Sequence, residues 1–204
     1  MSEENLYTFE NPEYRKTYWH TCSHVMAQAV KRLWPEVQLA IGPSIAEGWY
    51  YDFDSPFSFT QEHLDQIEAE MKKICKERLH LERSEKPRPE AIAYMEEKNE
   101  PYKVELIQDL PQDAVISFYT QGEFTDLCAG PHLDSTGRIK GNAFKLTQCC
   151  GAYWRGDSNR KCSSGSTASP SPKRRSWTST CAGRRRPGSG TTTSWAGSWS
   201  SSPP

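Results

Sequence analysis

The last 43 residues of this sequence contain no Leu, Ile, Val, Met, Phe or Tyr, and they contain no Asp or Glu. Residues 162–204 consist mainly of Ser, Thr, Gly, Pro and Arg, with a few Trp. Such a segment cannot bury enough apolar surface to offset the entropy that it would lose on ordering. The composition therefore predicts a disordered tail at 162–204, and it leaves enough preceding chain for one domain with a core.

The chain also lacks an apolar run near the roughly 20 residues that span a bilayer. Its opening residues, MSEENLYTFENPEYRK, are too polar and acidic for a signal peptide. Without a secretory signal, the seven cysteines are expected to be free thiols in a reducing compartment rather than disulfides. We therefore expect a cytoplasmic protein that has no membrane partner.

Charge is divided unevenly along the chain. All 26 acidic residues precede position 162, whereas six of the 25 basic residues follow it, so the body carries a net charge of -7 and the tail +6. A body this acidic does not favour nucleic-acid binding through its net charge. A polyanionic partner would have to meet a local basic patch.

Hydrophobic periodicity predicts helices first and strands mostly later. Helices are expected at 18–34, from an N-cap at Thr60 to about Leu79, and near 88–98; strands are expected as a pair around 49–53 and at 102–110, 115–127 and 142–154. A turn at residues 121–122 interrupts the 115–127 segment. This order of elements is typical of an α+β fold with antiparallel strands.

Two pairs of residues have the spacing of metal ligands. His20 and His24 in HTCSH lie four apart on one helical face, and Cys128 and His132 lie four apart on the Gly-Pro loop of TDLCAGPH. Together they form a four-ligand set for a tetrahedral ion such as zinc. Each pair also has an ordinary explanation, because imidazoles are often satisfied in a core and a lone cysteine often acts as a small buried apolar residue.

Three further positions carry candidate chemistry. Asp126 would share a strand face with Cys128, where it could orient a histidine or a water, although a solvated carboxylate at a strand end is an equal alternative. Lys103 could place a positive charge near an ester or phosphate oxygen, or simply be solvated. Tyr50 and Tyr51 could stack on a base or bond a ribose hydroxyl, but adjacent strand tyrosines usually divide between core and solvent.

Five segments resemble, in order, the editing domain of bacterial threonyl-tRNA synthetases: HTCSHVMAQAVKRLWP, AIGPSIAEGWYYDFD, EPYKVELI, GEFTDLCAGPH and FKLTQCCGAYWRGDSN. The resemblance extends to the editing modules of alanyl-tRNA synthetases and their free-standing relatives, which share the HxxxH and CxxxH pairs. It implies a domain at 14–161, between a polar lead-in at 1–13 and the tail, in which an antiparallel sheet packs around a central helix.

The activity that this resemblance implies is hydrolysis of the ester in mischarged Ser-tRNA(Thr). Serine lacks only a methyl group of threonine, which is worth about 1–3 kcal/mol of discrimination, so a second site must clear the smaller product. The motifs of the family imply that the pocket is formed by His20, His24, Cys128 and His132. Asp126 and Lys103 would lie beside these four residues. Tyr51, in preference to Tyr50, would lie near the terminal adenosine of the tRNA acceptor end.

The mechanism implied is attack of water on the ester carbonyl. A histidine, or a water bound to one, would act as the base, with Lys103 or His132 near the leaving ribose oxygen. Zinc on the four-ligand set is suggested by the alanyl relatives, whereas hydrolysis by the same residues without a metal stays open.

The sequence departs from the family in its extent. We expect no ATP binding and no activation of threonine, because the small N-terminal domain, the class II catalytic domain and the anticodon-binding domain of the family are missing. The homodimer contacts of the parent ligase would also lie in missing domains. Two alternatives to editing in this chain are a non-catalytic module that binds the tRNA acceptor end, and a free-standing trans-editing deacylase for Ser-tRNA or Ala-tRNA.

The tail departs from the family in sequence as well. After RGDSNRK the family continues with a segment like MLQRIY, whereas this chain continues with CSSGST. Codons exist that encode CSSGST in one frame and MLQRIY one base earlier. We therefore hypothesise a one-nucleotide frameshift, real or a sequencing error, at about residue 161; the alternative is a basic arm that binds RNA.

Overall fold

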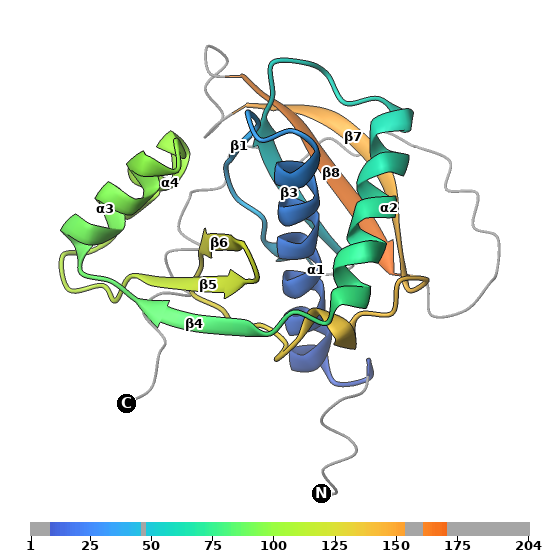
Figure 1. The fold of residues 1–204 in the computed structure, drawn as a ribbon, viewed down its shortest axis with the longest axis horizontal. Helices are drawn as coiled ribbons and strands as arrows, with labels where there is room; N and C mark the ends of the chain where they lie inside the picture. Colours follow the sequence, from blue (N-terminus) through green and yellow to red (C-terminus); the bar gives the residue numbers. More distant parts are fainter. Residues whose placement is uncertain (1–8, 46–47, 154–160, 171–204) are drawn as a thin grey trace, which may run out of the picture.

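The computed structural model describes residues 9–45, 48–153 and 161–170 (Figure 1). Its elements follow the chain in the order α1 Pro12–Leu33, β1 Gln38–Leu39, β2 Ser44–Ile45, β3 Gly48–Asp54, α2 Gln61–Glu77, β4 Leu81–Glu85, α3 Arg88–Glu97, α4 Pro101–Asp109, β5 Ser117–Gln121, β6 Phe124–Leu127, a 3-10 turn Thr136–Arg138, β7 Phe144–Tyr153 and β8 Lys161–Pro170. Within these ranges, none of the helices combines the length and the apolarity that crossing a bilayer would require.

Helix α1 is the element around which the described chain is arranged. It begins earlier than the predicted residue 18, because the Asn11 side chain caps it by accepting the N–H of Glu13 at 3.0 Å and Pro12 occupies the first turn. It ends at Leu33, next to the predicted stop at Pro35. Residues 21–30 of this helix are all buried, so it must pack against other elements on more than one side.

The larger sheet is antiparallel and has the strand order β1-β3-β8-β7, with β2 also paired to β3. Helices α1 and α2 pack together against this sheet, and Figure 1 shows α1 in the middle of the molecule with α2 on one side. Met26 of α1, Trp49 of β3 and Met71 of α2 are fully buried in the core that these elements share. The predicted strand pair near 49–53 and the predicted cap at Thr60 are confirmed.

The smaller sheet, of order β4-β5-β6, lies on the other side of α1 (Figure 1). Strands β5 and β6 form the expected hairpin, in which Gly122 adopts a φ of 61° at the turn. Helices α3 and α4 cover this sheet through a second core that includes Met95, Ile107 and Phe118. The α+β class is therefore confirmed, but the strands form two antiparallel sheets where we expected one.

The predicted strand at 102–110 is wrong, because these residues form helix α4. Pro101 sits in the first turn, where its missing N–H costs nothing. The buried side chains of the segment recur at a spacing of three and four rather than two, at Tyr102, Lys103, Leu106, Ile107 and Leu110. The segment is therefore an amphipathic helix, and Lys103 projects from a helix rather than from a strand.

The expectation of disorder from residue 162 does not hold for 162–170, which lie in strand β8. This strand pairs with β3 on one side and β7 on the other. The backbone N–H and C=O groups of both neighbours require partners, and a strand of any side-chain composition can supply them. Residues 171–204 lie outside the described ranges, so the expectation for them and the frameshift hypothesis stay predictions.

Candidate functional site

Cys128 and His132 lie on the loop that follows β6. The backbone of Cys128 is fixed by two bonds to Ser117 of β5: its N–H donates to the Ser117 carbonyl at 3.0 Å, and the Ser117 hydroxyl donates to its carbonyl at 2.6 Å. Gly130 turns the loop with a φ of 77°, and its N–H donates to the Cys128 sulfur at 3.2 Å. A side chain at Gly130 would collide with the Tyr119 ring, so the loop depends on glycine here.

The imidazoles of α1 meet this loop, as the proposed four-ligand set requires. The His132 ring centroid lies 4.2 Å from that of His20 and 4.2 Å from that of His24. The Cys128 Sγ lies 3.3 Å from His20 Nε2 and 3.1 Å from His132 Nε2. One ligand atom of each of the four residues lies within 4.8 Å of the others, so we name His20, His24, Cys128 and His132 the His/Cys cluster.

Desolvation keeps the His/Cys cluster uncharged, with His24 and Cys128 buried and His20 and His132 partly buried. It lowers the pKa of His20 to about 4 and of His24 to about 3, and it lowers the pKa of His132 well below the usual range. Burial also raises the pKa of the Cys128 thiol to about 12. At neutral pH the cluster therefore consists of a thiol and three neutral imidazoles. Each neutral imidazole has one nitrogen lone pair that can accept a proton.

The tautomer of His20 follows from its neighbour. Its Nδ1 lies 3.2 Å from the carbonyl oxygen of Pro131, and a carbonyl oxygen only accepts hydrogen bonds. The Nδ1 therefore carries the hydrogen, and the Nε2 keeps a lone pair. In His24, by contrast, Nδ1 is buried and has no hydrogen-bond partner among the residues that the structure describes.

A charged group lies beside the cluster. Lys103 Nζ of α4 is 2.7 Å from Asp126 Oδ1 of β6 and donates to the Tyr51 hydroxyl at 3.0 Å. The Tyr51 hydroxyl donates to Asp126 Oδ2 at 2.7 Å. Burial would raise the pKa of Asp126, but the Lys103 ammonium outweighs it and holds the carboxyl pKa below its usual value. These three side chains form the Lys103/Asp126/Tyr51 group.

Both groups face one cavity of about 300 Å³. His20, His24 and Cys128 line it together with Lys103 and Asp126, and Ile41, Leu106 and Ala129 are among its apolar lining residues. His132 is not among the lining residues, although its ring lies beside that of His20, which is. Lys16, an exposed residue of α1, also lines the cavity.

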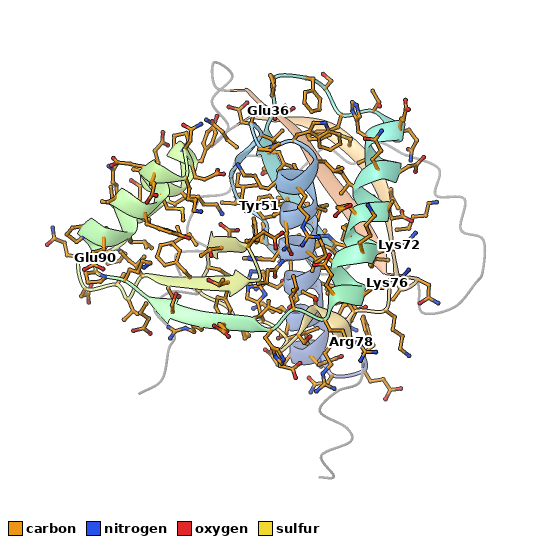
Figure 2. All side chains as sticks on the ribbon, in the orientation of Figure 1. Glu36, Tyr51, Lys72, Lys76, Arg78 and Glu90 are labelled. Atoms are coloured by element: carbon orange, nitrogen blue, oxygen red, sulfur yellow. The ribbon has the colours of Figure 1, made fainter. Side chains whose placement is uncertain are left out.

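The two predicted tyrosines divide as expected. Tyr51 is fully buried in the charged group, and Figure 2 shows it beside α1 in the interior of the molecule. Tyr50 is partly buried and points to the opposite face of β3. Neither tyrosine is among the residues that line the cavity, so the contact of Tyr51 with a terminal adenosine stays a prediction. Asp126 is buried and paired, which excludes the solvated strand-end carboxylate that we had kept as an alternative.

Two features of the site were missed in the sequence. Thr21, the residue after His20 in HTCSH, has its hydroxyl 3.3 Å from His132 Nδ1. Residues 41–44 of the IGPS turn form one wall of the cavity. The turn signal of Gly42 and Pro43 was visible in the sequence, but its place beside the histidines depends on how β3 returns along α1.

The donor set is chemically suited to zinc. Three imidazole nitrogens and one sulfur are typical zinc ligands, and neutral imidazoles are the form that binds a metal. The separations of 3.1 and 3.3 Å between sulfur and nitrogen are close to the roughly 3.5 Å that a tetrahedral zinc ion would impose. The buried thiol would have to lose its proton on binding. The cluster therefore fits the metal, and zinc stays a hypothesis.

A comparison with protein families shows what the region around this site is similar to. Residues 116–162, which include the Cys128 loop, match the family described as the threonyl and alanyl tRNA synthetase second additional domain. This match ends at the residue where the composition of the chain changes.

The particular relatives are threonine-tRNA ligases. The chain is 62% identical over 156 residues to that of Clostridium kluyveri, 61% over 160 residues to that of Clostridium tetani, and 60% over 157 residues to that of Acetivibrio thermocellus. These alignments cover 76–78% of this chain but only 24–25% of each ligase. The chain is thus similar over most of its length to a fragment of threonine-tRNA ligase, and it spans about a quarter of the length of these relatives.

Proposed function

We propose that this chain hydrolyses the aminoacyl ester of mischarged Ser-tRNA(Thr) in the cavity between α1, α4 and the Cys128 loop. One observation carries the proposal: neutral imidazoles and a buried ammonium line the same cavity. Ester hydrolysis is accelerated by a base for the attacking water and by a donor or cation for the oxygen that gains charge, and these two groups can supply both. A volume of about 300 Å³ is at the lower end for small-molecule sites and suits an aminoacyl group better than a whole nucleotide.

His20 is the base that we assign. Its Nε2 keeps a lone pair because Nδ1 is held by the Pro131 carbonyl, and its side chain lines the cavity. A water held by this nitrogen would pass a proton to it while attacking the ester carbonyl. The neutral His24, one helical turn away, is the second candidate for this step.

Lys103 is the cation that we assign. Two of its three N–H donors are satisfied by Asp126 and Tyr51, as far as the described residues show. The third is available to the developing oxyanion or to the leaving ribose oxygen. Asp126 and Tyr51 hold the ammonium in place before substrate binds, so the cation needs no reorganisation during the reaction. Because His132 does not line the cavity, Lys103 is the better candidate for the leaving oxygen.

When bound, zinc would be held by the His/Cys cluster and would polarise the ester carbonyl or lower the pKa of a water. The roles of Lys103 and Asp126 would be the same in either case. The partner that we propose is the acceptor end of tRNA(Thr), with Lys16 supplying a positive charge to a backbone phosphate at the cavity. Ligation of threonine with ATP, and a homodimer, are properties proposed for the longer parent protein.

The test is a deacylation assay on purified full-length chain with Ser-tRNA(Thr), with Thr-tRNA(Thr) as the substrate to be spared. His24→Ala and Cys128→Ala should each lower the rate at least about tenfold, which corresponds to about 1.4 kcal/mol of transition-state stabilisation. His80→Ala is the matched control, because His80 is exposed and lies outside the cavity. Binding of Ser-tRNA(Thr) without turnover would refute hydrolysis and favour the acceptor-end binding module; equal rates on unrelated Ser-tRNA and Ala-tRNA would favour a trans-editing deacylase.

We also propose that the chain is out of frame after about residue 161. The end of the family match at residue 162 supports this, together with the loss of every acidic and large aliphatic residue beyond it. Resequencing the codons around Lys161 is the test. A confirmed present frame that runs into a further folded domain would refute the frameshift.

A further inference from the structure

Thr21 is a buried residue of α1 whose hydroxyl joins three groups. It donates to the backbone carbonyl of Thr17 at 2.9 Å, and it accepts the N–H of Leu133 at 2.9 Å. The same oxygen lies 3.3 Å from His132 Nδ1. Its exposed fraction is 0%, so water does not compete for these bonds.

The count of hydrogens decides the direction of the third bond. A threonine hydroxyl has one hydrogen and two lone pairs. The hydrogen points to the Thr17 carbonyl, which cannot donate, and one lone pair accepts from Leu133. Only a lone pair remains for His132, so the Nδ1 of His132 must carry the hydrogen.

We propose that Thr21 is a positioning residue that holds His132 in the Nδ1–H tautomer and thereby directs the lone pair of His132 Nε2 at the Cys128 sulfur. In the Nε2–H tautomer, a lone pair of His132 Nδ1 would face a lone pair of the Thr21 hydroxyl oxygen, and the hydrogen bond between these two buried atoms would be lost. This tautomer would also bring an N–H to a sulfur that already accepts the N–H of Gly130.

The proposal changes the hydrogen bonding of the whole cluster. His20 Nε2 and His132 Nε2 then present two lone pairs to Cys128, at 3.3 and 3.1 Å, and the thiol has one hydrogen to give. His132 does not line the cavity, and the thiol 3.1 Å away can donate its hydrogen to His132 Nε2. His20, which does line the cavity, keeps a lone pair for a donor that arrives from outside.

This last step rests on the proposed function, because the arriving donor there is the attacking water. Thr21 would thus act on the reaction through His132 and Cys128, without contacting substrate. The tautomer itself depends only on the protein and can be tested separately.

The test is long-range ¹H–¹⁵N correlation NMR of the histidine-labelled full chain, at neutral pH and in the presence of a chelator. The His132 signals are assigned with His132→Gln. In the unsubstituted chain Nδ1 should be protonated and Nε2 should not. Thr21→Val, which keeps the shape but removes the hydroxyl, should shift His132 to a mixture or to the Nε2–H form, and Thr21→Ser should restore Nδ1–H.

An Nε2–H tautomer in the unsubstituted chain would overturn the proposal, whatever the variants do. An unchanged tautomer in a folded Thr21→Val chain would also overturn it, since Thr21 would then serve only the helix and the Leu133 loop. Should Thr21→Val not fold, Thr21→Ala and the unsubstituted spectrum decide by the same criterion.

Deacylation supplies an independent arm. Thr21→Val should lower the rate about fivefold, which corresponds to about 1 kcal/mol, the typical value of one hydrogen bond, and Thr21→Ser should recover it. The expected tautomers in a chain that does not hydrolyse Ser-tRNA(Thr) would refute the proposed function and leave the role of Thr21 standing. A chain that hydrolyses Ser-tRNA(Thr) but carries the Nε2–H tautomer of His132 would refute the role of Thr21 and leave the proposed function standing.

Discussion

Replacing Asp126 by Asn should destabilise the fold far more than the loss of a typical ion pair. The Lys103 and Asp126 side chains are 4% and 2% exposed, and their charged atoms are 2.7 Å apart. Removing the carboxylate charge leaves the ammonium buried with neutral partners, the amide oxygen of the new side chain and the Tyr51 hydroxyl. Breaking a buried pair in this way typically costs about 3–5 kcal/mol. That is a large share of the roughly 5–15 kcal/mol by which a domain is stable.

A double-mutant cycle isolates the pairing itself. Lys103→Met alone leaves an unpaired carboxylate, so it should also be strongly destabilising, whereas Asp126→Asn with Lys103→Met leaves no buried charge. The double variant should therefore be more stable than the sum of the single losses by at least about 1.5 kcal/mol. Asp134 and Arg138 provide the matched control, because this ion pair is 62% and 55% exposed and its removal should cost less than about 1 kcal/mol.

The assay is urea unfolding of the full chain, followed by tryptophan fluorescence and far-UV circular dichroism. The slope of free energy against urea must stay constant across the series, so that the midpoints report stability. Additivity of the Asp126 and Lys103 losses to within about 0.5 kcal/mol would refute the reasoning. It would mean that the two charges do not depend on each other and that Lys103 is not held by Asp126.

Three further predictions concern other parts of the structure. Gly42→Ala should lower the free energy of unfolding by about 1–3 kcal/mol and impair hydrolysis, because the added carbon would overlap the Tyr51 ring. An unchanged urea midpoint would contradict this packing. Stability in the presence of a chelator should fall as the pH drops from 6.5 toward 4. In this range the unfolded chain binds protons at His20 and His24, whereas the folded chain, in which their pKa values are about 4 and 3, does not. Equal urea midpoints at pH 7.5 and pH 5 would argue against a neutral cluster. Thr60→Ala should cost about 1 kcal/mol by removing the cap of α2, with the deacylation rate at saturating substrate unchanged.

The His/Cys cluster could be predicted because its geometry is almost entirely local. A spacing of four on a helix fixes the relation of His20 to His24, and a short Gly-Pro loop fixes that of Cys128 to His132. That the two pairs meet was an inference from the chemistry of the set. The structure brings one ligand atom of each of the four residues together, as that inference predicted.

The position of Lys103 could be predicted only in part. Apolar and polar residues alternate over part of 102–110, which favoured a strand, but Pro101 and the spacing of Leu106 and Leu110 fit a helix equally well. Packing against β5 and α3 decides between the two periods, and packing is not visible in a short segment. The role of Thr21 could not be predicted either, because it depends on where the 128–133 loop crosses α1.

Burial and the arrangement of the two groups together explain how His24 stays unprotonated beside a carboxylate. His24 Nε2 lies only 3.9 Å from Asp126 Oδ2, and an unpaired carboxylate at that distance would raise the pKa of His24 and favour an imidazolium. Lys103 forms an ion pair with the other carboxylate oxygen and so offsets the negative charge of Asp126. The Lys103 ammonium also disfavours a proton on His24. Burial acts in the same direction. The Lys103/Asp126/Tyr51 group therefore supplies a fixed cation to the cavity and, by neutralising Asp126, helps burial to keep His24 unprotonated.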